Sequence, residues 1–175
     1  SGDDIQILYL SFNNLEETPP HDYLKRMTKL SYLDCTTNKL KRIYALGKEI
    51  APTSMLFDYN QISEIIVPEG DYFCGMSQLE TFSCSNNRLT KLPDLFSARS
   101  IYAMLTADFS SNEISELENG DEWRGINTGT LNLADNRFTT LPKHLIGSGS
   151  TVEVLMLSAN GLRTIEEGAL IGANS

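Results

Sequence analysis

The sequence predicts an α/β solenoid, a right-handed coil of short parallel strands joined by variable helix or loop returns. Three observations support this fold class. One eleven-residue pattern recurs seven times, successive copies lie 22 to 27 residues apart, and apolar residues alternate with polar ones inside each copy. Repetition at this spacing is typical of a stack of similar units, each contacting only its neighbours. We therefore expect a single array of about seven repeats over residues 1–175.

The pattern is clearest in residues 79–89, LETFSCSNNRL, which have the form L-x-x-F-x-C-x-x-N-x-L. The other frames, aligned on their asparagine, are IQILYLSFNNL (5–15), LSYLDCTTNKL (30–40), PTSMLFDYNQI (52–62), MLTADFSSNEI (104–114), TGTLNLADNRF (128–138) and VEVLMLSANGL (152–162). Frame three departs by opening with Pro52, and frame six by opening with Thr128. Each frame defines one repeat.

The fourth and sixth residues of each frame are apolar and alternate with polar or variable ones, which predicts a short strand. Strands about twenty residues apart in sequence must be parallel, and right-handed crossovers are strongly preferred. Parallel sheets usually bury both faces, but this alternation leaves one face uncovered. We call it the open face, made of the second, third, fifth, seventh and eighth residues of each frame, and expect it to be the concave surface of the solenoid.

The ninth residue of every frame is an asparagine. A coil that turns sharply after each strand leaves inward-pointing backbone N–H and C=O groups without sheet partners, and a buried amide offers two donors and an acceptor to them. The sequence therefore predicts a structural ladder of Asn13, Asn38, Asn60, Asn87, Asn112, Asn136 and Asn160.

The returns differ between repeats. Apolar spacing predicts short helices in residues 21–29, with Tyr23, Leu24 and Met27 on one face, and in 94–104, and a further turn or two in 43–50. Residues 65–67, Ile-Ile-Val before a proline, favour an extended stretch followed by a long loop. Residues 118–129, rich in glycine and acidic side chains, predict a loop held down by Trp123.

Composition argues against several classes of protein. The net charge of −9 and the isoelectric point near 4.7 disfavour nucleic acid as a partner, and no apolar run is long enough to span a membrane. Cys35 and Cys84 occupy the same inward position two repeats apart, so their Cα atoms should lie ~10 Å apart, beyond disulfide reach. We expect both to be buried thiols, and Cys74, in the longest connection, to be a free thiol.

Candidate metal and catalytic groups are sparse. His21 and His144 have no second ligand at a metal-binding spacing. Glu116, Glu118 and residues 121–122 form an acidic group, but they lack the D-x-D-x-D-G spacing of a calcium loop. We expect no metal, no cofactor and no catalytic residue, and hence a protein that is not an enzyme.

The open face has an unusual composition. None of the 14 Lys and Arg falls on it, whereas six acidic residues do, and its aromatic residues all belong to the first three repeats. Exposed aromatic groups beside polar ones are typical of contact surfaces. The predicted partner-binding residues are Tyr9, Phe12, Tyr32, Asp34, Leu56, Asp58 and Tyr59. Two simpler explanations stand beside this one: strands disfavour lysine, and the tyrosines could stack on one another and bind nothing.

The cysteine-bearing frames LSYLDCTTNKL and LETFSCSNNRL resemble the repeats of secreted and surface-attached bacterial leucine-rich repeat proteins, the broad group that includes internalins. The resemblance implies a leucine-rich repeat solenoid at the bacterial cell surface or outside the cell. It also implies a protein or peptide partner on the concave side, with carbohydrate as second choice; the acidic face favours basic groups on that partner. Alternative functions are a structural spacer and a non-catalytic part of a larger enzyme. Because the chain starts at Ser1 inside its first repeat, we expect a piece of a longer protein.

Overall fold

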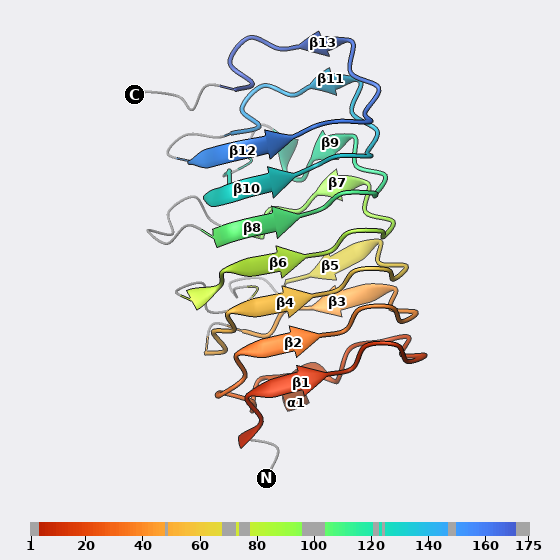
Figure 1. Cartoon of the computed structure of the whole chain (residues 1–175), viewed down its shortest axis with the longest axis vertical. Helices are drawn as coiled ribbons and strands as arrows, with labels where there is room; N and C mark the ends of the chain where they lie inside the picture. The colour runs from red at the N-terminus through yellow and green to blue at the C-terminus, as the bar shows by residue number, and fades with distance from the viewer. Residues whose placement is uncertain are drawn as a thin grey trace.

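The computed structural model describes residues 4–47, 49–67, 73, 78–95, 104–120, 123, 125–146 and 150–170. Its strands stack in chain order from the N-terminus to the C-terminus, as Figure 1 shows. One strand from each frame enters a seven-stranded parallel sheet, and this confirms the predicted solenoid. The strands of this sheet are β1 (Ile7–Tyr9), β2 (Tyr32–Asp34), β4 (Ser54–Leu56), β6 (Thr81–Ser83), β8 (Met104–Asp108), β10 (Thr128–Asn132) and β12 (Val152–Met156).

The sheet aligns equivalent frame positions side by side. The fourth residues of successive frames are register partners, for example Leu33, Met55 and Phe82. In the five inner repeats, the fourth and sixth residues of each frame are completely buried. The open-face residues on the strands of the same repeats are partly or fully exposed. The predicted alternation is therefore correct, and it aims one side of every strand into the core.

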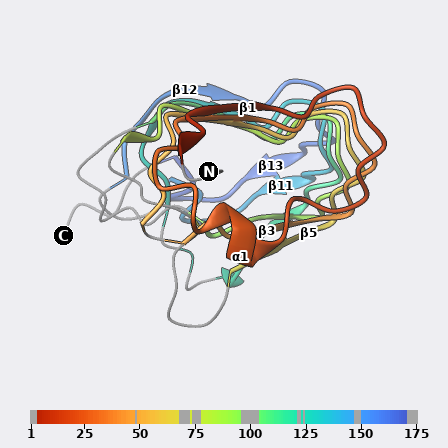
Figure 2. The same ribbon diagram turned by 90° about the horizontal axis from the view of Figure 1, so that it is seen from below.

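The returns contain strands that the sequence analysis missed in part. Three parallel pairs form: β3 (Arg42–Tyr44) with β5 (Glu64–Ile66), β7 (Lys91–Leu92) with β9 (Glu116–Leu117), and β11 (Thr140–Leu141) with β13 (Thr164–Ile165). Viewed along the stack, the large sheet follows one side of the coil and the returns close the other (Figure 2). The extended stretch predicted around Ile65 is confirmed.

The helix predicted in residues 43–50 is wrong at its start, where the chain is strand β3. Ile43 is β-branched, which favours a strand, and its side chain is fully buried opposite Ile65 of β5. The inward apolar position that looked like the first turn of a helix is instead the central residue of a paired strand.

Among the described residues, α-helical structure is limited to α1 (His21–Leu24). It is shorter than the predicted helix of residues 21–29, because after Leu24 the chain continues in single turns. Leu24 and Met27 are buried as expected, but Tyr23 is 61% exposed and does not share their face. Most of the second predicted helix, residues 96–103, lies outside the described residues. No described helix has the length and apolarity needed to cross a membrane.

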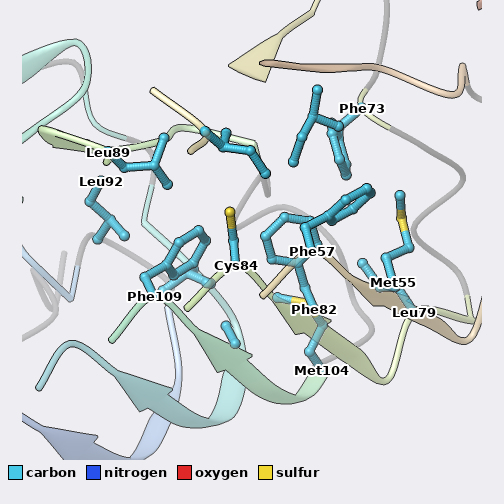
Figure 3. Packing of buried hydrophobic residues seen from close by; sticks show 14 of the residues in the cluster. Met55, Phe57, Phe73, Leu79, Phe82, Cys84, Leu89, Leu92, Met104 and Phe109 are labelled. Carbon is cyan, nitrogen blue, oxygen red and sulfur yellow. The ribbon is translucent and has the colours of Figure 1, made fainter. Parts of the chain in front are cut away.

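Aromatic rings fill the centre of the core. The rings of Phe57, Phe82 and Phe109 come from the fourth and sixth positions of three consecutive frames, with centroids 6.1 and 5.5 Å apart. Phe73, from the return after β5, packs edge-on against Phe82 at 5.5 Å. Figure 3 shows these rings with Cys84 between them. Consecutive repeats are thus held together by direct contact of large apolar side chains.

The cysteine and tryptophan expectations concern the same core. Cys35 and Cys84 are free and fully buried, as predicted, whereas Cys74 lies outside the described residues. Trp123 is buried, and its indole Nε1–H donates a hydrogen bond to the backbone carbonyl of Leu145 at 3.1 Å. The loop that precedes β10 is therefore held down by this residue, as the sequence indicated.

Candidate functional site

The asparagine side chains connect each repeat to the one before it. The Oδ1 atom of Asn87 accepts the N–H of Ile62, in the preceding repeat, at 2.9 Å. Its Nδ2 donates to the carbonyl of Phe57, also in the preceding repeat, at 3.0 Å, and to Cys84 and Ser85 of its own repeat. The same contacts recur at Asn38, Asn60, Asn112, Asn136 and Asn160.

Asn13 differs because no described repeat precedes it. Its side chain is exposed, and within the described residues Nδ2 donates only to Leu10 and Ser11 of its own turn. The ladder thus runs in one direction, each amide bonding toward the N-terminal side, and Asn13 is its exposed first member.

The residue before each ladder asparagine has a left-handed backbone, which the sequence analysis did not foresee. All seven of these eighth-position residues have φ between 52° and 56°: Phe12, Thr37, Tyr59, Asn86, Ser111, Asp135 and Ala159. Positive φ is rare for aromatic and β-branched residues. The N–H of this residue donates to the seventh-position carbonyl of the next repeat, for example from Tyr59 to Ser85 at 3.1 Å. No composition signal marks the position, since only two of the seven are Asn or Asp.

The acidic residues of the open face partly serve the turns. Asp34 Oδ1 accepts the N–H of Thr36, and Asp108 Oδ1 accepts the N–H of Ser110, each two residues later. Asp58 Oδ1 instead reaches the next repeat, where it accepts the N–H of Ser85 at 2.7 Å. These bonds give the acidic composition a local structural reason that sequence alone did not supply.

No carboxylate of the open face is neutralised by a cation in the described part of the chain. The ion pairs seen there lie elsewhere: Lys25 with Asp22, Lys29 with Asp4, Lys41 with Glu16, Lys91 with Glu116, and Arg137 with Glu113. The face therefore carries uncompensated negative charge.

The structure brings some of the predicted binding residues together. Tyr9 and Tyr32 stand on neighbouring strands with ring centroids 5.3 Å apart. Asp34 is the register partner of both Tyr9 and Leu56, so the three side chains stand in a row across β1, β2 and β4. Desolvation raises the pKa of the Tyr32 phenol, and the nearby charge of Asp34 raises it further. One part of the simpler explanation, contact of the tyrosines with one another, thus holds for Tyr9 and Tyr32, whose rings are tilted and not stacked.

Phe12 and Tyr59 are not part of that row. They lie in the eighth-position turns, with Thr37 in the turn between them, and are 81% and 62% exposed. Leu56 is the one aliphatic residue among the predicted binding residues, and the prediction missed four exposed apolar residues on the same face: Ile7, Leu105, Val154 and Met156. Their signal was present as apolar residues at outward frame positions. The face is therefore apolar at both ends, and its aromatic residues are at the N-terminal end only.

Where the structure describes them, the acidic group and the histidines considered as metal or catalytic candidates either lie away from the open face or already have hydrogen-bond or ion-pair partners. Glu116 pairs with Lys91, and Glu118 Oε2 accepts the N–H of Asp94. Residues 121–122 and the side chain of His21 are outside the described part, and the half-buried His144 stands in a turn with φ 65°. Among described residues, no group of three or more His, Cys, Asp or Glu side chains has a metal-binding arrangement.

Comparisons with known proteins agree on the family. The Leucine Rich Repeat family model matches residues 4–25 and 78–98. A leucine-rich repeat protein from Bacteroides eggerthii superposes with a TM-score of 0.86 at 36% identity, covering 99% of this chain and 29% of that one. One from Bacteroides thetaiotaomicron gives 0.82 at 36% identity, covering 99% and 22%.

Curated relatives are more distant. Tsukushi from Gallus gallus is 28% identical over 170 residues, which cover 81% of this chain and 44% of that protein. Leucine-rich repeat serine/threonine-protein kinase 1 from Mus musculus is 32% identical over 110 residues, covering 62% of this chain and 6% of the kinase. The chain thus spans less than half the length of each of these relatives.

Proposed function

We propose, on the premise that this chain belongs to the leucine-rich repeat family, that its open face is the binding surface of a non-enzymatic protein-interaction module. Such a fold is suited to this work because a stack of repeats presents one long surface that no other part of the coil covers. The anchor of the partner lies over the first three repeats, at Tyr9, Phe12, Tyr32, Asp34, Leu56, Asp58 and Tyr59.

One observation carries this placement: exposed aromatic rings stand beside carboxylates that have no cation partner among the described residues. Tyrosine is enriched among residues that dominate binding energy, because a large ring buries much area at little entropic cost. Uncompensated carboxylates attract cationic partners and repel acidic ones. The partner is therefore a protein or peptide with basic groups beside an apolar one, in preference to a carbohydrate, and the net negative charge disfavours nucleic acid.

The proposed location is the bacterial cell surface or the extracellular space. The resemblance of the cysteine-bearing frames to surface-attached bacterial repeats supports it, and so does the likeness to two Bacteroides proteins. Protease treatment of intact cells of the source organism, followed by immunoblotting of this segment, tests the location. Digestion without cell lysis supports it, and protection until lysis contradicts it.

Binding is tested by capture from the native environment and quantitative affinity measurement. The double variant Tyr32→Ala with Tyr59→Ala should lower the affinity for the captured partner at least about tenfold, which corresponds to about 1.4 kcal/mol of binding free energy. The matched control is Thr106→Ala with Thr130→Ala, at the same face in the half that lacks aromatic residues, and should leave affinity nearly unchanged. A larger loss from the threonine pair would place the site at the other end.

The same two double variants distinguish this function from the two alternatives. A structural spacer would tolerate both double variants without loss, because it has no ligand to release. A non-catalytic part of a larger enzyme is compatible with the small share of the mouse kinase that matches this chain. In that case the tyrosine variants would alter how the enzyme recognises its substrate.

A further inference from the structure

We propose that Asp34, with Tyr9 and Tyr32 beside it, forms a recognition site for an arginine side chain of the protein partner. This inference rests on the proposed function and sharpens it, because it selects arginine over lysine and assigns one carboxylate to the contact. The three side chains come from β1 and β2, on the outward side of the sheet.

The placement follows from the register. Tyr9 is the cross-strand partner of Asp34, and Tyr32 precedes Asp34 by two residues, so all three side chains emerge on the same face. The tyrosine rings are tilted by 52° with centroids 5.3 Å apart. Tyr9 is 66% exposed, whereas Tyr32 is partly covered. A ligand can therefore reach the Tyr9 ring and the carboxylate at once.

The carboxylate is oriented but not neutralised. Asp34 Oδ1 accepts the Thr36 N–H at 2.9 Å, which fixes the side chain within the turn. Within the described residues, no donor contacts Oδ2 and no cation pairs with the group. The site thus offers a free anionic oxygen whose position is already set, so little rotamer freedom is lost when a donor binds.

Arginine fits this arrangement better than lysine. A guanidinium group is planar, stacks on aromatic faces and still donates N–H groups in its plane to a carboxylate. A lysine ammonium is a compact, strongly hydrated charge with no plane to stack. Leu56, the partner of Asp34 on β4, lies on the other side and can contact the methylene groups of the side chain.

Asp108 provides a matched comparison, because it occupies the same frame position on β8. Both of its oxygens are engaged: Oδ1 accepts the Ser110 N–H at 2.8 Å, and Oδ2 accepts Asn132 Nδ2–H at 3.0 Å. Its register partners are Ser83 and Asn132, with no aromatic ring. The same residue type at the same position is therefore not expected to bind arginine.

The test is a titration of the 15N-labelled chain with acetyl-arginine-N-methylamide and, separately, acetyl-lysine-N-methylamide at equal ionic strength. The reporter is the Thr36 amide, whose N–H is bonded to the Asp34 carboxylate. We expect the arginine compound to shift this amide at least about threefold more than the lysine compound. Asp34→Asn should abolish the difference while its amide oxygen still accepts the Thr36 N–H, and Asp108→Asn should preserve it.

Equal shifts from the two compounds, or an arginine response that survives Asp34→Asn, would overturn the assignment. Failure here and failure of the proposed function are distinguishable. If the tyrosine variants release the captured partner while the Thr36 amide ignores arginine, the binding face stands and the arginine site is lost. If arginine shifts Thr36 but the tyrosine variants release nothing, the site stands and the placement of the partner is wrong.

Discussion

Replacing Asn87 with alanine should destabilise the protein by about 1–3 kcal/mol, and the structure says where the loss arises. Three carbonyls that accept its amide each keep another donor. Phe57 O keeps Asn60 Nδ2, Cys84 O keeps Asn112 Nδ2, and Ser85 O keeps the Tyr59 N–H. The Ile62 N–H, by contrast, has Asn87 Oδ1 as its partner, and Ile62 is fully buried. One orphaned buried donor accounts for about 1–3 kcal/mol.

Urea unfolding followed by circular dichroism measures this loss. Asn13→Ala is the matched control in the same frame position, because its amide is exposed and Leu10 O keeps the Asn38 donor. Asn14→Ala, one residue out of register and exposed, is the second control. Both should stay within about 0.5 kcal/mol of the parent. Equal losses at Asn87 and Asn14 would refute the frame and the hydrogen-bonding argument together.

Two further predictions concern the core and the turns. Burial raises the pKa of Cys35 to about 12 and that of Cys84 well above its usual value. In the unfolded chain both ionise near the ordinary value of about 8.5. Their contribution to stability is therefore complete below that pH and lost as pH rises toward the folded values. The free energy of unfolding, measured by urea melts, should fall less between pH 7.5 and pH 9.5 in the double variant Cys35→Ala with Cys84→Ala than in the parent. An equal fall in both proteins would contradict the raised pKa values of the two thiols. Thr37 is β-branched and has a left-handed backbone with φ 53°. Because asparagine tolerates this region better, Thr37→Asn should raise the free energy of unfolding by about 0.5 kcal/mol. Thr36→Asn, outside the left-handed position, should give no gain.

The sequence was sufficient to predict the strands of the large sheet because each is defined by two inward residues at fixed distance from an asparagine. It failed in the return at Ile43, because two or three apolar residues near a glycine suit a helical turn and a paired strand equally well. The strand forms there because Ile43 pairs with Ile65 of the neighbouring repeat, 22 residues later in the chain. Contacts between repeats are invisible in the composition of one return.

The candidate site was predictable in composition but not in geometry. Outward frame positions identified Tyr9, Tyr32 and Asp34 as neighbours, yet only the structure shows that the two rings are in contact. It also shows that, as far as the described residues go, Asp34 has a donor on one oxygen whereas Asp108 has donors on both. These differences depend on residues one repeat away, such as Asn132, whose role cannot be inferred from its own frame.

The asparagine amides bond almost entirely to main-chain atoms, in part those of their own turn and in part those of the adjoining repeat. The groups that they contact there, such as the Ile62 N–H and the Phe57 carbonyl, exist whatever side chain the position carries. Recognition between neighbours at the turn is therefore indifferent to sequence. A gene encoding such an array can lengthen by duplicating any segment from one asparagine to the next, and the new junction forms its amide bonds without compensating mutations. Only the apolar contacts of the core must then adapt, which leaves the open face free to diversify.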